Sequence, residues 1–336
     1  MTGPTSPPRL GELDALRGIA ALIVVLFHYT WKMPDIMPAA RTIGWGLAWG
    51  AYGVHLFFAI SGFVILMTLE RTRNAADFAV SRFARLYPAY WAAVALTTVG
   101  TMIAAPSLAQ PPGVVLVNLT MLQGFFYLPA VDGVYWSLTV ELSFYACMLA
   151  LWRLRLLGRI ETVLLCWLAL KPLFGLVDFM PYRLGLILVA DTIPFFALGM
   201  AAYRVHIGVR RWSQQWPVVL AGLAALLIVD GVQDALVYAI VAGIFWSMTM
   251  GWLVRLNHPV LLWLGGISYT LYLLHQNLGY ALIAALENAG APPWLALCLT
   301  VAAALGLAHL VCEYVERPAL HGIRQWWKRR TTPALA

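Results

Sequence analysis

Long apolar runs separated by short polar stretches dominate this sequence of 336 residues. Hydrophobic residues make up 62% of the chain and charged residues only 11%, and the mean hydropathy is +0.78. Soluble domains carry about 25% charged residues, and a membrane-spanning helix needs about 20 predominantly apolar residues. The pattern therefore predicts an all-α integral membrane protein with about ten transmembrane helices. The predicted spans are 13–31, 46–69, 87–105, 135–152, 161–177, 183–203, 216–230, 235–254, 261–286 and 293–314.

The lysines and arginines favour one side of the predicted membrane. If the N-terminus lies inside, 18 of the 22 fall at inner helix ends and loops. Cytoplasmic loops carry an excess of Lys and Arg, so both termini are predicted to be cytoplasmic. The four basic residues on the outer side are Lys32, Arg41, Lys171 and Arg183.

This topology divides the chain into three parts. We expect a cytoplasmic N-terminal tail over 1–12, a ten-helix transmembrane domain over 13–316 and a basic, aromatic cytoplasmic tail over 317–336. The last part combines Trp326 and Trp327 with clustered Lys and Arg, a composition typical of an amphipathic anchor on anionic lipid.

The net charge of +7 does not indicate a nucleic-acid partner, because the basic residues follow the positive-inside pattern and form no basic face. The four cysteines lie within apolar runs without paired spacing, which favours small core residues over a disulfide framework. The sequence offers no metal site with credible ligand spacing. The oligomeric state is not indicated.

The first predicted span carries two ionisable residues, Arg17 and His28. Eleven positions of helix amount to three turns plus about 20°, so both side chains point the same way, roughly 16 Å apart along the axis. Ionisable groups inside a membrane helix usually face the bundle interior or a wet cavity. An imidazole suits general-base catalysis, and an arginine suits phosphate or developing negative charge. The alternatives are a structural hydrogen-bonding role for His28 and simple pairing of Arg17 with Asp14.

Three further residues place charge at the ends of predicted spans. Arg82 and Arg85 enter the third span and share one helix face at i, i+3, which fits a phosphate clamp or a topology anchor. Glu141 lies just inside the fourth span, with Ser137 one turn earlier. An intramembrane carboxylate is functional by default. It could orient a histidine, as the acid of a catalytic dyad does, or hold a structural arginine.

A polar stripe follows one face of the ninth predicted span, where Ser268, Tyr272 and His275 are spaced i, i+4, i+7. Inter-helix hydrogen bonding accounts for such a stripe. The other interpretation makes these three residues part of a cofactor-binding path.

Five sequence blocks occur in one order and carry a family resemblance. They are L-D-A-L-R-G-I-A-A-L-I-V-V-L-F-H (13–28), G-V-H-L-F-F-A-I-S-G-F (53–63), R-F-A-R-L-Y-P-A-Y-W (82–91), W-S-L-T-V-E-L-S-F-Y (136–145) and I-S-Y-T-L-Y-L-L-H (267–275). Together they resemble the membrane acyltransferase 3 family, in a stand-alone form without an appended soluble domain.

The resemblance assigns roles to residues already singled out. The family's essential positions fall on Arg17 and His28, on Arg82 and Arg85, and on Glu141. Two positions depart from its pattern: His55 stands where members often carry an acidic or other polar residue, and Ser81 where many have a further basic residue.

The resemblance implies a multi-pass O-acyltransferase of the bacterial inner membrane. Its donor would be cytoplasmic acetyl-CoA or another acyl-CoA, and its acceptor a hydroxyl of a carbohydrate or glycolipid at the outer face, with no metal involved. Arg82 and Arg85, with Arg17, would pair with the CoA phosphates. His28 would act as general base, and Glu141 would hold His28 in its useful tautomer or bind the acceptor.

Two alternatives stay open at this point. Within the enzyme reading, His28 could itself carry the acyl group as a covalent intermediate. The rival function is a transporter or flippase of a glycolipid or small metabolite that uses the same polar residues as ligands.

Overall fold

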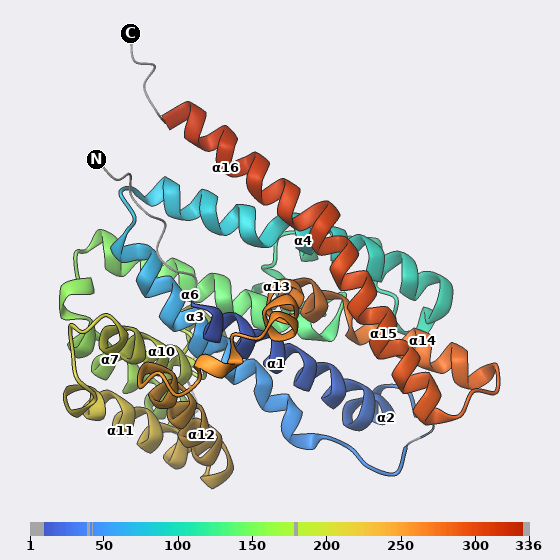
Figure 1. The fold of residues 1–336 in the computed structure, drawn as a ribbon, viewed down its shortest axis with the longest axis horizontal. Coiled ribbons are helices and arrows are strands. Elements are labelled where there is room, and N and C mark those ends of the chain that lie inside the picture. The colour runs from blue at the N-terminus through green and yellow to red at the C-terminus, as the bar shows by residue number, and fades with distance from the viewer. Residues whose placement is uncertain (1–9, 39–40, 42, 178–180, 332–336) are drawn as a thin grey trace.

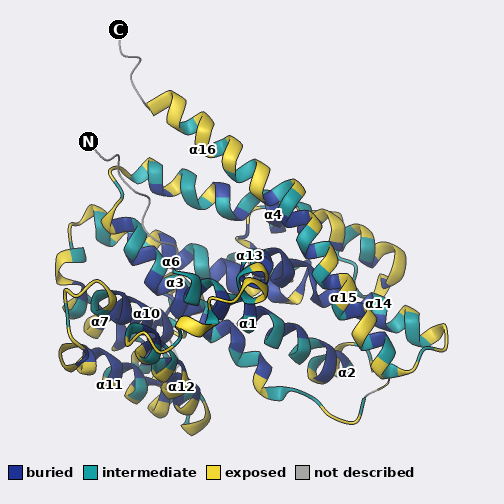
Figure 2. Ribbon diagram, viewed as in Figure 1, coloured by how far each residue is buried: buried dark blue, intermediate teal, exposed yellow. Residues whose placement is uncertain are grey.

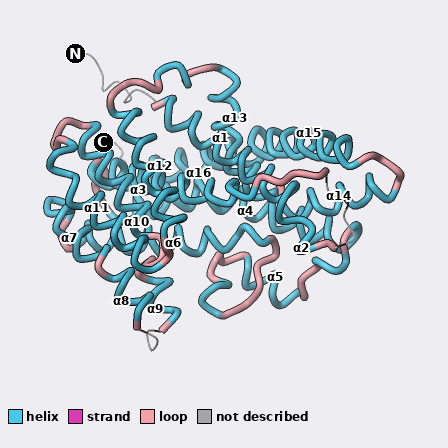
Figure 3. Tube along the Cα trace, turned by 90° about the horizontal axis from the view of Figure 1, so that it is seen from below, coloured by secondary structure: helices cyan, strands magenta, loops and turns pink. Residues whose placement is uncertain are grey.

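The computed structural model describes residues 10–38, 41, 43–177 and 181–331, and every regular element in these ranges is helical. Figures 1 and 3 show helices joined by loops, with no strand in the described part. The α-helices are α1 (Gly11–Phe27), α2 (Met33–Ile36), α3 (Gly53–Glu70), α4 (Ala75–Ala104), α5 (Pro112–Asn118), α6 (Trp136–Arg153), α7 (Ile160–Leu168), α8 (Leu170–Leu176), α9 (Tyr182–Ile187), α10 (Ile193–His206), α11 (Trp212–Val229), α12 (Val232–Thr249), α13 (Pro259–Leu274), α14 (Gln276–Asn288), α15 (Pro293–Val311) and α16 (Arg317–Thr331).

Seven helices of the described chain are long and apolar enough to cross a membrane. The all-α membrane class is thus confirmed, whereas the number ten is not, and the cytoplasmic placement of the termini stays a prediction. The seven are Gly11–Ile36, Ala48–Glu70, Ala75–Ala104, Gly133–Arg153, Trp212–Val229, Val232–Thr249 and Pro293–Thr331.

Three predicted spans are each divided into two helices. The segment 161–177 forms α7 and α8, the segment 183–203 forms α9 and α10, and the segment 261–286 forms α13 and α14 with His275 at the junction. Hydropathy does not locate such breaks, because irregular backbone at membrane depth is tolerated wherever protein surrounds it. The helix α10 illustrates this, since it is buried along nearly its whole length (Figure 2).

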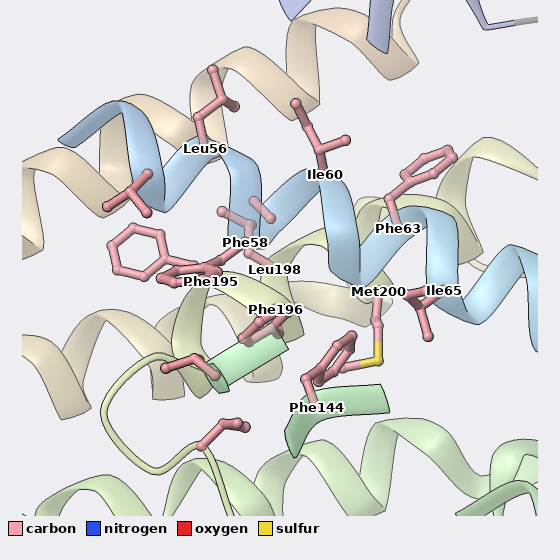
Figure 4. Close-up of a cluster of buried hydrophobic side chains, with 14 of the residues drawn as sticks. Leu56, Phe58, Ile60, Phe63, Ile65, Phe144, Phe195, Phe196, Leu198 and Met200 are labelled. Atoms are coloured by element: carbon pink, nitrogen blue, oxygen red, sulfur yellow. The ribbon is translucent and has the colours of Figure 1, made fainter. Parts of the chain in front are cut away.

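An aromatic cluster where α3, α6 and α10 meet forms the main hydrophobic core (Figure 4). Phe144 stacks on Phe196 with ring centroids 3.9 Å apart, and Phe58 lies 5.0 Å from Phe196. The backbones of α3 and α10 come very close, because a Cβ added to Gly199 would lie 1.8 Å from the carbonyl oxygen of Ala59. Small residues at a helix crossing permit this approach, and it fixes α3 against the core.

A second close crossing joins α1 to α13. A Cβ on Gly265 would lie 2.0 Å from the carbonyl oxygen of Asp14, and one on Gly18 would lie 2.6 Å from the backbone nitrogen of Gly265. Ten residues after these glycines, α1 leads to His28 and α13 leads to His275, and the two imidazoles are in contact. The two helices therefore run side by side in the same direction, and the glycine crossing sets the register of both ends.

The C-terminal helices form one continuous rod in which α15 passes through a π-helical turn, Cys312–Glu316, into α16. The rod runs beside the first part of α4 (Figure 1). The indole nitrogen of Trp327 donates a hydrogen bond to Asp77 Oδ1 at 2.7 Å. The basic tail predicted from the sequence is therefore a helix docked on α4.

Candidate active site

A cavity of about 120 Å³ lies among α1, α3, α4, α6 and α13. Six of the eight candidate residues line it, so residues from four distant sequence blocks converge there. The polar side chains of its wall are Arg17, Ser61, Arg82, Arg85, Ser137, Glu141, Tyr145, Ser268, Tyr269 and Tyr272. The remaining two candidates, His28 and His275, contact each other at the far ends of α1 and α13.

Arg17 reaches the cavity from α1 and forms an ion pair with Asp14, one turn earlier on the same helix. This pairing was one of the alternatives open from the sequence. The Nε atom of Arg17 is buried and has no hydrogen-bond partner in the described chain. One edge of the guanidinium is thus neutralised by Asp14, and donor capacity remains toward the cavity.

The two arginines of α4 differ, although the sequence predicts that they act as one clamp. Arg85 forms an ion pair with Glu316, whose side chain is only 2% exposed, and its guanidinium lies 5.5 Å from the ring centre of Tyr269. Arg82 donates a hydrogen bond to Ser81 Oγ at 3.2 Å, and no carboxylate of the described residues lies within ion-pairing distance of it. Arg82 is therefore the arginine free to meet an incoming anion.

Glu141 faces the same cavity from α6. Its Oε1 atom accepts hydrogen bonds from Ser61 Oγ at 3.0 Å and from Tyr145 OH at 2.5 Å. Within the described chain it shares no hydrogen bond with His28. The structure thus departs from the interpretation in which Glu141 holds the tautomer of His28, because the two groups lie at different ends of the site.

The partner of His28 is His275, and the surrounding carbonyls define which nitrogens carry protons. Nδ1 of His275 lies 2.8 Å from the carbonyl oxygen of Tyr272 and 3.1 Å from that of Leu271. Carbonyls only accept, so this Nδ1 is protonated and Nε2 of the neutral ring is an acceptor. Nδ1 of His28 lies 3.1 Å from that Nε2 and 2.8 Å from the carbonyl oxygen of Val24, and is therefore a donor. Nε2 of His28 is left as the nitrogen with a free lone pair.

Local backbone irregularity positions both imidazoles. His28 begins a π-helical turn, His28–Lys32, and His275 occupies the junction between α13 and α14. Such π-turns often occur at functional sites. Tyr29, the next residue in the π-turn, donates from its hydroxyl to the carbonyl oxygen of His275 at 2.7 Å. The two irregular segments are therefore tied directly to each other.

Asp132, which the sequence analysis did not single out, fixes the start of α14. Its fully buried carboxylate accepts the backbone N–H of Asn277 at 2.9 Å and that of Val134 at 3.2 Å. Burial raises the pKa of Asp132 to about 7, while these two N–H donors favour its charged form. Asp132 thereby ties the loop before α6 to the residue pair that follows His275.

Glu316 is the other residue that the sequence analysis missed. An acidic residue at the end of the last apolar run is a signal for function, so its presence near the site could be suspected. Its pairing with Arg85, 231 positions away, requires the tertiary structure.

A family model described as "Acyltransferase domain" matches residues 10–312. The exopolysaccharide production protein ExoZ of Rhizobium meliloti is 26% identical over 337 residues, covering 89% of this chain and 97% of its own. Nodulation protein 10 of Rhizobium leguminosarum bv. viciae is 25% identical over 369 residues, covering 95% and 96%. The acyltransferase MdmB of Streptomyces mycarofaciens is 30% identical over 181 residues, 48% of this chain and 44% of its own. No solved structure matches.

Proposed function

Because the chain belongs to the acyltransferase family whose model matches residues 10–312, we propose that it transfers an acyl group, specifically acetyl, from cytoplasmic acyl-CoA to a glycan hydroxyl. The acceptor is an exopolysaccharide or a related carbohydrate or glycolipid at the outer face of the bacterial inner membrane. The names of the two relatives that align over nearly their whole length, one for exopolysaccharide production and one for nodulation, support a carbohydrate acceptor.

One structural observation carries this proposal: the cavity that joins three arginines to the polar face of α13. Arg17, Arg82 and Arg85 reach it from two helices, and Ser268 and Tyr272 continue its wall toward the histidine pair. An anionic thioester donor needs this combination, with cations for its phosphates and a polar path for its pantetheine arm. In this scheme the arginines bind the donor and the histidines act on the acceptor.

The chemistry follows from the tautomer of His28. Its unprotonated Nε2 takes the proton of the acceptor hydroxyl while the hydroxyl oxygen forms a bond to the thioester carbonyl carbon. When the tetrahedral intermediate collapses, the C–S bond breaks and the sulfur leaves with the proton held by His28. The products are the ester of the glycan and free CoA. His275 acts through His28, because it accepts the Nδ1 proton of His28 and so keeps Nε2 free.

Direct attack is the form of the reaction that we propose, and the covalent acyl-His28 route makes a different prediction. A covalent intermediate releases one equivalent of CoA before any acceptor is added. Direct transfer releases CoA only in the presence of acceptor. Rapid-quench measurement of CoA release without acceptor separates the two routes.

The function is tested by incubating purified protein in lipid nanodiscs with acetyl-labelled CoA and candidate glycans. We expect label in ester linkage on the glycan, sensitive to mild base, and none with the His28→Gln variant. Matched proteoliposomes report transport: uptake of the glycan without acylation would support the transporter alternative and contradict the proposal.

A further inference from the structure

A second cavity of about 700 Å³ lies between α16, the start of α4 and the loop that joins α3 to α4. One carboxylate, that of Asp77, faces it. Five cationic side chains also line it: Arg71, Arg73, Arg82, Arg324 and Lys328. We call this cavity the basic groove.

We propose that the basic groove binds the 3′-phosphorylated ADP end of the acyl-CoA donor, and that α16 is a wall of the donor site. Arg324 and Lys328 of α16 would face the 3′-phosphate, and Arg71 and Arg82 the diphosphate. This assignment rests on the proposed acyl-CoA function. It also gives the basic tail a role other than the lipid anchor expected from its composition.

The position of Arg82 supports this proposal. Arg82 lines both the basic groove and the cavity of the active site. Of the three arginines at the active-site cavity, it is the one without a carboxylate partner in the described chain, and its Nε atom is buried without a hydrogen bond. A donor whose 3′-phosphate lies in the groove would have its diphosphate beside Arg82, where the two cavities adjoin, and its pantetheine arm in the active-site cavity. Among the residues that the structure describes, no other lines both cavities.

The two sides of the contact between α16 and α4 have different chemistry. Trp326 faces an apolar hollow that it shares with Val80 and Phe83, and it is 49% exposed. Trp327, the next residue, is turned to the basic groove, where Asp77 accepts its indole N–H. Lipid chains suit the first side, whereas the second offers an immobilised indole among cations.

The charge and the shape of the groove fit a nucleotide with several phosphates. A phosphate monoester carries about −1.5 to −2 charges near neutral pH, and the diphosphate adds more. Five cations opposed by one carboxylate match such a ligand. The ring of Trp327, held by its bond to Asp77, provides a fixed surface for a purine. A single lipid phosphate would leave most of these cations without a partner.

Equilibrium binding to the full-length protein in phosphatidylcholine nanodiscs tests the proposal. The probes are CoA, dephospho-CoA, which lacks the 3′-phosphate, and pantetheine. We expect Arg324→Ala/Lys328→Ala to weaken CoA binding about 10- to 100-fold, as expected for lost charge-assisted hydrogen bonds. Binding of pantetheine should not change. The matched control is Arg329→Ala/Arg330→Ala, which removes the same charge from the same helix outside the groove and should bind CoA like the wild type.

Each outcome decides between specific alternatives. If CoA binds the wild type and the groove variant equally, or if both charge-removal variants weaken it alike, the groove assignment is wrong while the acyl-CoA function stands. If the variants differ only in nanodiscs with anionic lipid, the groove holds lipid headgroups and the assignment is also wrong. If CoA does not bind the wild type at all, the acyl-CoA function itself fails. Should the double variant not fold, Arg324→Gln and Lys328→Gln provide the same comparison one charge at a time.

Discussion

The two ends of the α1–α13 pair hold opposite kinds of chemistry. Near the glycine crossing, Arg17 lies beside Arg82 and Arg85 in a cavity whose binding groups are charged. At the far end, His28 and His275 meet as neutral rings whose hydrogen bonds go to each other and to main-chain carbonyls. Under the proposed function the site holds an anionic donor and moves a proton, and this separation favours both tasks, because cations next to a base would lower its basicity.

The arginine end and the histidine end of the α1–α13 pair are also stabilised differently. Removing charge from water is costly unless the charge is paired, and at the charged end Asp14 pairs with Arg17 and Glu316 with Arg85, of which only Glu316 is fully buried. The histidine end needs no counter-charge, because rigid carbonyls of helical turns set its tautomers. Carboxylates therefore pair with cations at the charged end, whereas Asp132 near the histidine end accepts backbone N–H groups and has no ion-pair partner in the described chain.

The largest effect on stability is expected at Glu316. Glu316→Ala removes the buried partner of Arg85, whose own side chain is 26% exposed, and should lower the free energy of unfolding by about 2–4 kcal/mol. Glu313→Ala, three residues earlier in the same π-turn, breaks the more exposed pair with Arg317 and should cost about 0–1 kcal/mol. Thermal unfolding of the two variants in one detergent measures the difference. Equal losses would contradict the assignment of Arg85–Glu316 as the pair with the buried carboxylate.

An intermediate effect on catalysis is expected at His275. His275→Leu removes the acceptor for Nδ1–H of His28, so kcat should fall about 10²-fold, the low end of what a positioned base contributes. The KM for acyl-CoA should not change. His275→Gln retains an oxygen acceptor and should recover part of the rate, which a merely structural role would not predict. If both variants lose kcat to the same extent while remaining folded, the tautomer argument is wrong.

A smaller effect is expected where the two helices cross. Gly265→Ala places a Cβ 2.0 Å from the carbonyl oxygen of Asp14, and overpacking of this kind costs about 1–3 kcal/mol. Gly306→Ala in α15 meets open space and should be neutral or stabilising by up to about 1 kcal/mol. Unfolding curves give both values. A Gly265→Ala protein as stable as the Gly306→Ala protein would show that α1 and α13 are not locked by this contact.

Much of the candidate site could be predicted from the sequence, because its residues follow local helical patterns. Arg17 and His28 share a helix face, and Ser268, Tyr272 and His275 follow one stripe; both patterns depend only on helical periodicity. The helical membrane class follows from composition in the same way.

The parts that the sequence did not predict depend on contacts between distant segments. His275 rather than Glu141 contacts His28, because the Gly18–Gly265 crossing sets the register of two helices far apart in the chain. Likewise, the pairing of Arg85 with Glu316 leaves Arg82 as the free cation. The break at His275 coincides with the polar run His275–Asn277, but the apolar segments on either side of this run together have the length of one span, so averaged hydropathy does not separate them.

The proposed mechanism divides the site into a donor-binding end and a proton-transfer end. The most direct test compares Arg82→Gln with His28→Gln in one acyl-transfer assay. Rates are measured against acyl-CoA concentration at saturating acceptor, with both proteins folded as judged by thermal unfolding. We predict that Arg82→Gln raises the KM for acyl-CoA about 10-fold or more and reaches a kcat near that of the wild type. His28→Gln should retain the KM and lose kcat by about 10²–10⁴-fold. A His28→Gln protein with wild-type kcat, or an Arg82→Gln protein that loses kcat at an unchanged KM, would contradict the account.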